Sequence, residues 1–162
     1  MFPSPLLRLA EVVLADARIA RLRIVTAESC TGGMIGALLT EIPGSSDVFD
    51  RGFIVYTNRS KQDLLGVPGD LVADMGEVSE AVCRMMAEGA IENSNAQLAV
   101  AVTGIAGPTG GLPGKPVGTV WIGWKRRGQY PLAEVFHFDG DRESVRRQTV
   151  AASLQGLLAV AA

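Results

Sequence analysis

A serine, a tyrosine and a lysine that lie close together in the sequence have the clearest potential for chemistry. Ser46 lies in the polar stretch 44–47, Tyr56 ends an apolar run, and Lys61 comes early in the next helical pattern. A serine becomes a nucleophile when a base takes its proton. A lysine with a lowered pKa, or a tyrosine beside a lysine, can supply that base. From these residues alone, a polar turn, a half-buried tyrosine and a solvated lysine are the simpler interpretation.

A second group of polar side chains lies in the stretch 28–33. Ser29 and Thr31 bring hydroxyl groups, and Gly32 and Gly33 let the backbone approach a ligand closely. The stretch joins a predicted strand to a predicted helix, whose N-terminal amides suit a phosphate or a developing oxyanion. The structural alternative is a capped, glycine-rich turn without a ligand.

Two further stretches have the composition of a binding site. Thr103 and Gly104 end a predicted strand and open a glycine-rich loop, and such a loop inside a compact domain is more often functional than idle. Arg142 and Arg146 are four positions apart and share one face near a predicted helix N-terminus, so they are candidates for a phosphate clamp. A surface loop and a solvated basic face are the corresponding structural alternatives.

Histidine and cysteine are too scarce for a metal site. His137 is the single histidine, and Cys30 and Cys83 are far apart in the sequence, so we expect no metal ligand cluster. Strand alternation places His137 on the outer side of a predicted strand, which makes it a poor catalytic base. We therefore look for the base among lysine, tyrosine and the carboxylates.

Composition limits the classes of partner. The 15 basic and 17 acidic residues give a net charge of −2, which argues against general nucleic-acid binding. No apolar run reaches the roughly 18 residues of a membrane span. The apolar start is interrupted by charges and lacks a basic leader, so we predict a helix there and not a signal peptide. The few cysteines suit a reduced, cytoplasmic setting.

Hydrophobic patterning predicts helices and strands in alternation. We expect strands over residues 23–27, 51–57 and 97–103, and two more over 119–126 and 131–138 that form a hairpin. We expect helices over residues 4–20, 34–42, 58–66, from 79 onwards, and 141–160, and a short turn or helix over 68–75. The predicted N-caps are Ser4, Asn58, Ser79 and Asp141. Strands that alternate with helices predict a single layered α/β domain over residues 1–162, with a mixed sheet.

Six motifs occur in order along the chain and cover nearly all of it. They are TAESCTGG, PGSSDVFDRGFIVYTNRSK, GEVSE, AVTGIAGPTGG, KPVGTVWIGW and GDRESVRRQ. Together they resemble the CinA C-terminal domain family, whose single-domain members include nicotinamide mononucleotide deamidases.

The resemblance implies an amidohydrolase that converts nicotinamide mononucleotide to nicotinate mononucleotide and ammonia in pyridine nucleotide recycling. It further implies a three-layer α/β/α sandwich, no metal or organic cofactor, a small-molecule nucleotide substrate, and a homo-oligomer of two or more copies. No nucleic acid or membrane partner is expected. The family's molybdopterin-related partner domain is absent from this sequence.

Site residues follow from the matching motif positions. The resemblance implies that Ser46 attacks the carboxamide carbon, with Lys61 as the base and Tyr56 relaying or orienting the proton. Ser29 is the second candidate for the nucleophile; otherwise it binds substrate or stabilises the oxyanion. The groups expected to hold the oxyanion or the phosphate are Thr31, Gly32, Gly33, Thr103, Gly104, Arg142 and Arg146.

Two other functions remain open at this point. One is a non-catalytic nucleotide-binding or interaction module of the same competence/damage-inducible family. The other is a hydrolase that acts on a different pyridine nucleotide. Ammonia release from the mononucleotide distinguishes both from the amidohydrolase.

Overall fold

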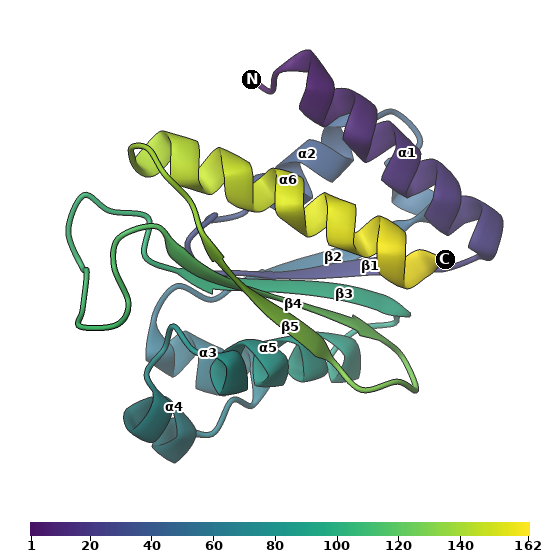
Figure 1. Ribbon diagram of the computed structural model, residues 1–162. Helices are drawn as coiled ribbons and strands as arrows, with labels where there is room; N and C mark the ends of the chain where they lie inside the picture. Colours follow the sequence, from purple (N-terminus) through teal and green to yellow (C-terminus); the bar gives the residue numbers. More distant parts are fainter.

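A computed structural model describes residues 1–162, and a single five-stranded sheet organises the whole chain (Figure 1). The helices are α1 (Ser4–Ala20), α2 (Met34–Glu41), α3 (Asn58–Leu65), α4 (Gly69–Met75), α5 (Glu80–Glu92) and α6 (Arg142–Ala161). The strands are β1 (Ile24–Glu28), β2 (Phe49–Ile54), β3 (Leu98–Gly104), β4 (Thr119–Arg126) and β5 (Leu132–His137). Every strand and helix expected from the sequence is present, with shifts of a few residues at the ends.

The sheet is mixed, as predicted, and its strand order is β2-β1-β3-β4-β5. The first three strands in this order are parallel, and β4 and β5 form the antiparallel hairpin. Helices α1, α2 and α6 cover one face, and α3, α4 and α5 lie on the other (Figure 1). The predicted three-layer α/β/α sandwich is confirmed.

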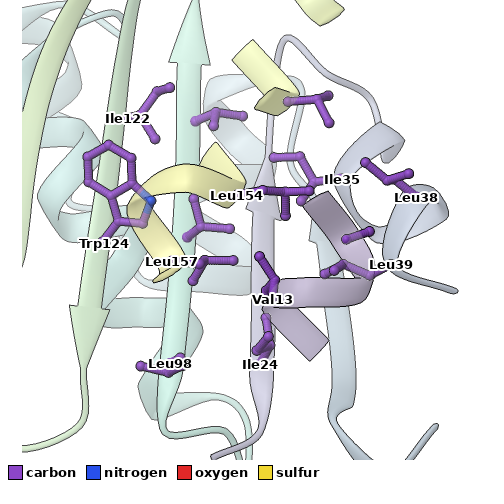
Figure 2. Close-up of a cluster of buried hydrophobic side chains, with 14 of the residues drawn as sticks. Val13, Ile24, Ile35, Leu38, Leu39, Leu98, Ile122, Trp124, Leu154 and Leu157 are labelled. Atoms are coloured by element: carbon purple, nitrogen blue, oxygen red, sulfur yellow. The ribbon is translucent and has the colours of Figure 1, made fainter. Parts of the chain in front are cut away.

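Two hydrophobic cores hold the layers together. Figure 2 shows the core between the sheet and helices α1, α2 and α6, where Leu154 and Leu157 of α6 lie near Ile122 and Trp124 of β4. On the opposite face, aliphatic residues of α5 such as Met86 pack against the small side chains of the central strands. Strands β1 and β3 are buried on both faces because each core takes alternate side chains.

Side-chain caps fix where several helices begin. Asp141 and Ser79 accept hydrogen bonds from the first turns of α6 and α5, as predicted. Two predicted caps were wrong by one residue. Thr57, not Asn58, accepts from the first turn of α3, because its extended backbone lets the hydroxyl reach the amide of Ser60. Ser4 is the first residue of α1 and makes no cap hydrogen bond.

The carboxyl ends of β1 and β3 meet at one edge of the sheet. The register pairs Glu28 with Val102, so Ser29 and Thr103 are the next residues on neighbouring strands. The loop between β3 and β4 extends beyond this edge (Figure 1). Ligands of open α/β sheets bind at such an edge. None of the helices combines the length and the apolar character of a membrane span.

Candidate active site

A cavity of about 240 Å³ opens at the carboxyl edge of the sheet. Its walls come from the turn after β1, the segment after β2, the segment before α5, the end of β3 and the start of α6. The ten lining residues are Ser29, Cys30, Tyr56, Thr57, Glu77, Val78, Thr103, Gly104, Ala106 and Arg142.

Lys61 lies beneath this cavity and points its amine at Ser29. The side chain is only 1% exposed. Its Nζ donates to Ser29 Oγ at 3.3 Å and to the backbone carbonyl of Tyr56 at 3.2 Å. The cap at Thr57 fixes the first turn of α3, and Lys61 follows in that helix. The structure thus brings together a buried amine and a hydroxyl that lines the cavity.

Burial sets the protonation of this amine. Removal from water lowers the pKa of Lys61 below the ordinary value for lysine, and the negative charge of Glu77 opposes part of that shift. The neutral amine is therefore populated at a lower pH than in a solvated lysine. A neutral amine is the form that can accept a proton from a serine hydroxyl.

The turn that carries Ser29 is anchored from below by a buried carboxylate. Glu28 is 1% exposed and accepts three hydrogen bonds, from Thr31 Oγ1 at 2.7 Å and from the amides of Ile35 and Gly36 at 2.8 and 3.0 Å. A carboxylate at a helix N-terminus is stabilised by the unpaired amides there. Thr31 therefore points toward Glu28, and the α2 amides of Ile35 and Gly36 are already occupied.

Glycines make the sharp bend of this turn possible. Gly32 and Gly33 have φ values of 58° and 103°, which side-chain-bearing residues rarely adopt. Neither glycine lines the cavity. Their conformation gives both glycines a role in the path of the backbone. The predicted binding role stays a prediction, since both line the second cavity of the chain, of about 560 Å³, together with Arg146.

The two arginines of α6 do different things. Arg146 holds the turn, because its Nε and one terminal nitrogen donate to the carbonyls of Cys30 and Thr31 at 3.0 and 3.2 Å. Arg142 lines the cavity and donates to the carbonyl of Gly107 at 2.7 Å and to the Tyr56 hydroxyl at 3.4 Å. Spacing predicted one clamp made of both arginines, but only Arg142 faces the cavity.

Thr103 and Gly104 also line the cavity, from the end of β3. Thr103 is buried, and its hydroxyl donates to the backbone carbonyl of Glu77 at 2.8 Å. A hydrogen-bond donor near Thr103 is expected from the sequence. Because the hydroxyl proton is already engaged, the oxygen of Thr103 can offer a ligand only its lone pairs.

Ser46 is not part of this cluster. It lies in a short 3-10 helix at Ser45–Asp47, before β2 begins, whereas Tyr56 follows the end of that strand. The six residues of β2 span about 20 Å at roughly 3.3 Å per residue, so Ser46 and Lys61 lie at opposite edges of the sheet. The predicted arrangement of Ser46 with Tyr56 and Lys61 is not assembled within the chain.

Other groups hold the Ser46 turn in place. Arg23 donates to the carbonyl of Ser46 at 3.2 Å, and Arg18 forms an ion pair with Asp47 at 2.8 Å. The polar character of the stretch 44–47 therefore has a structural explanation.

Two carboxylates near the cavity had no predicted role. Glu28 and Glu77 occurred in the motifs that carried the family resemblance, but nothing in their type or spacing assigned them a function. Glu28 lies six residues before the start of α2, so its contact with the amides of that helix depends on the path of the intervening turn. For Glu77 no local signal existed, since its segment reaches the cavity only through the fold.

Cys30 lies beside Ser29, yet it is poorly suited to act as a nucleophile. Burial raises the pKa of its thiol to about 12, so the thiolate is rare at neutral pH. We expect Cys30→Ala to retain most activity and the native thiol to react slowly with iodoacetamide. Measurement of turnover and of the alkylation rate tests this, with Cys83→Ala as the buried-cysteine control. Loss of turnover in Cys30→Ala but not in Cys83→Ala would point to a thiol mechanism.

Comparison with known proteins gives a consistent result. A sequence model of the CinA C-terminal domain matches residues 6–161. The chain is similar to the nicotinamide-nucleotide amidohydrolase PncC of Pseudomonas putida, with 52% identity over 136 residues that cover 84% of each protein. It is also 50% identical over 137 residues to a CinA-like protein of Akkermansia muciniphila, covering 85% of this chain and 33% of that protein. It therefore spans about a third of the length of that relative.

The fold is also found among solved structures. The crystal structure of the competence/damage inducible protein CihA from Agrobacterium tumefaciens superposes with a TM-score of 0.95 at 45% sequence identity. The match covers 98% of this chain and 97% of that one.

Proposed function

This chain belongs to the CinA C-terminal domain family, and we propose that it is an amidohydrolase that converts nicotinamide mononucleotide to nicotinate mononucleotide and ammonia. The observation that carries this proposal is the contact between the buried Lys61 Nζ and Ser29 Oγ, beside a cavity at the carboxyl edge of the sheet. A relative of similar length is named for this activity.

Ser29 is the nucleophile in the proposed reaction. In the neutral form of Lys61, the Nζ lone pair accepts the hydrogen bond from the Ser29 hydroxyl. As Oγ forms a bond to the carboxamide carbon, the hydroxyl proton passes to Nζ, and the carbonyl oxygen becomes an oxyanion. Lys61 then carries the positive charge, and its contact with the Tyr56 carbonyl, at 3.2 Å, stabilises it.

Backbone amides of the turn are the candidate donors for the oxyanion. The amides of Cys30 and Thr31 donate to no backbone carbonyl. The amide that follows a nucleophilic serine is well placed for this role in other hydrolases. Arg146 and Glu28 hold this turn from two sides, so the donors are fixed before the reaction begins.

Release of ammonia completes the first half of the reaction. The carbon–nitrogen bond breaks as Lys61 returns its proton to the leaving nitrogen, which departs as ammonia and leaves an ester on Ser29. The lone pairs of Thr103 Oγ1 can accept a hydrogen bond from the amide NH₂ before this step. A water molecule, deprotonated by Lys61, then attacks the ester and regenerates the Ser29 hydroxyl.

Arg142 is the proposed phosphate ligand. Two of its five N–H groups are engaged, by Gly107 and by the Tyr56 hydroxyl, which leaves others for an anion. Tyr56 is 59% exposed at the mouth of the cavity, and its hydroxyl positions this guanidinium. Tyr56 thus acts in binding, and the Ser29–Lys61 contact needs no proton relay through it.

Replacement of the two arginines separates binding from positioning. We expect Arg142→Ala to raise KM for the mononucleotide by roughly ten- to a hundredfold. This factor corresponds to the loss of one charge-assisted hydrogen bond, which contributes about 1.5–3 kcal/mol. KM for nicotinamide riboside, which lacks the phosphate, should change little. Arg146→Ala should lower kcat for both compounds, because the Ser29 turn loses its anchor. Steady-state kinetics of both variants on both substrates provides the test.

An unchanged preference for the nucleotide over the riboside in Arg142→Ala would contradict the phosphate assignment. The site would then lie elsewhere, and Arg146 with Arg147 beside the second cavity, of about 560 Å³, would be the next candidates.

The direct test of the proposed function is ammonia release. The purified chain should release ammonia from nicotinamide mononucleotide, and release from the riboside and from the dinucleotide should be slower. A chain that binds the mononucleotide without releasing ammonia would be a binding module. For this chain, we also predict a homo-oligomer, a cytoplasmic location and a place in pyridine nucleotide salvage. Light scattering of the purified chain tests the oligomeric state.

A further inference from the structure

The cavity carries opposite charges on its two sides. Among its lining residues Glu77 is the one carboxylate and Arg142 the one guanidinium. Glu77 lies in the segment between α4 and α5, in the lower layer of Figure 1, whereas Arg142 begins α6 in the upper layer. A ligand that enters between the layers therefore meets a negative group on one side and a positive group on the other.

The proposed substrate has a matching distribution of charge. Its pyridine nitrogen is bonded to the ribose, so the ring is a pyridinium with a permanent positive charge, and its phosphate is negative. Free nicotinamide has a neutral ring, and so has the dihydro form of the mononucleotide. The proposed reaction itself does not require the ring charge to be recognised, because it takes place at the carboxamide.

We propose, on the basis of the amidohydrolase function above, that Glu77 is a specificity-determining residue that selects substrates with a cationic pyridinium ring. With the ring toward Glu77 and the phosphate toward Arg142, the mononucleotide binds in one orientation across the cavity. Electrostatic complementarity of this kind contributes to specificity by penalising the reversed orientation and the uncharged analogue.

The backbone around Glu77 is held firmly. The Thr103 hydroxyl donates to the Glu77 carbonyl at 2.8 Å, and the Ser79 hydroxyl donates to the carbonyl of Gly76 at 2.8 Å. Ser79 also caps α5. These contacts fix the segment that carries Glu77 against the end of β3, so that its position relative to Ser29 is set before a ligand binds.

The carboxylate itself is free to interact with a ligand. Glu77 takes part in none of the ion pairs of the chain and accepts no side-chain hydrogen bond on its carboxylate oxygens. Its negative charge nonetheless acts on a buried group of the site, because it raises the pKa of Lys61, which burial lowers. A cation placed in the cavity experiences the same attraction.

Nicotinamide mononucleotide and its 1,4-dihydro form provide a matched pair of probes. Both carry the ribose phosphate and the carboxamide, and they differ chiefly in the charge on the ring. Binding is measured calorimetrically in the Ser29→Ala background, so that turnover and the different reactivity of the two amides play no part. We expect the cationic form to bind at least about tenfold more tightly.

Glu77→Gln in the same background should bring the two dissociation constants within about threefold of each other, by weakening the cationic form alone. Glu77→Asp should keep the preference. Glu80→Gln is the matched control, because Glu80 is a nearby carboxylate outside the cavity that pairs with Arg84. Loss of the Glu77 charge also lowers the pKa of Lys61, which weakens the repulsion between this amine and the cationic ring. This secondary effect favours the cationic form, so it cannot produce the expected loss of preference.

Two results would overturn the proposal: equal affinity for the two forms before Glu77 is changed, or a preference that persists in Glu77→Gln. Failure of the amidohydrolase function shows separately, as a wild-type chain that releases no ammonia. Circular dichroism of each variant establishes that its fold is retained, and a preference that weakens with added salt supports an electrostatic origin.

Discussion

Ser29→Ala is expected to lower kcat by about 10³- to 10⁶-fold, the range found when the nucleophile of a serine hydrolase is removed. The reason is that Ser29 Oγ lies 3.3 Å from Lys61 Nζ and lines the cavity. KM should change little, because the hydroxyl is one small contact among many. Initial rates of ammonia release, with the melting temperature as a control for folding, provide the measurement.

Ser46→Ala is the matched control for that prediction. Ser46 is exposed at the other edge of the sheet, so its hydroxyl has no base within the chain. We expect kcat within about threefold of the wild type, since surface substitutions away from a site usually change free energies by less than about 0.5 kcal/mol. Loss of activity in Ser46→Ala but not in Ser29→Ala would identify Ser46 as the nucleophile. A second chain would then be needed to supply its base.

Lys61→Met should lower kcat at least about a hundredfold, because it removes the general base while keeping a long, buried side chain. Lys61→Arg should be equally inactive, since a guanidinium does not give up its proton in the working pH range. Folding of both variants is checked by circular dichroism. Normal turnover in Lys61→Met would show that another group takes the serine proton.

The pH dependence carries an independent signature of Lys61. As pH rises through the lowered pKa of Lys61, the amine becomes neutral, and kcat/KM should rise and then level off below the ordinary lysine value of about 10.4. Between the folded and the unfolded pKa the unfolded chain binds more protons, so the free energy of unfolding also increases with pH in that window. In Lys61→Met, the free energy of unfolding should not show this increase with pH.

Local sequence patterns were sufficient to predict the helices, the strands and a layered α/β domain, whereas the three-layer arrangement was predicted from the family resemblance. A continuous apolar run marks a strand that is buried on both faces, such as β3, and the hairpin of β4 and β5 follows from two strand patterns joined at residues 127–128. The helix caps were predicted less well, because Thr57 and Asn58 are both good caps and only the backbone angles decide between them. Neighbouring polar residues therefore leave helix boundaries uncertain by one position.

The site was harder to predict, because it depends on which edge of the sheet each residue occupies. Ser29 and Tyr56 follow the ends of β1 and β2, and Thr103 lies in the last residues of β3, so all three meet at the carboxyl ends of the parallel strands. Ser46 precedes β2 and lies at the opposite end of the sheet. Proximity in sequence to Tyr56 and Lys61 favoured Ser46. Because β2 separates Ser46 from Tyr56, Ser29 is the serine that lies beside Lys61.

Side-chain direction explains the remaining differences. Residues four apart share a helix face, but Arg142 begins α6 and reaches the cavity, while Arg146 lies one turn later and meets the Ser29 turn. Likewise, Thr31 is adjacent to the site in sequence, yet its hydroxyl is engaged by Glu28. Neither orientation follows from spacing alone.

The identity of the nucleophile is tested most directly by trapping the ester intermediate. Nicotinamide mononucleotide is mixed with the enzyme, the reaction is quenched with acid within one turnover, and the peptides are analysed by mass spectrometry. We predict an adduct with the mass of nicotinate mononucleotide less one water on the peptide that contains Ser29, and no adduct in Ser29→Ala. The same adduct on Ser46 or on Cys30 would contradict it.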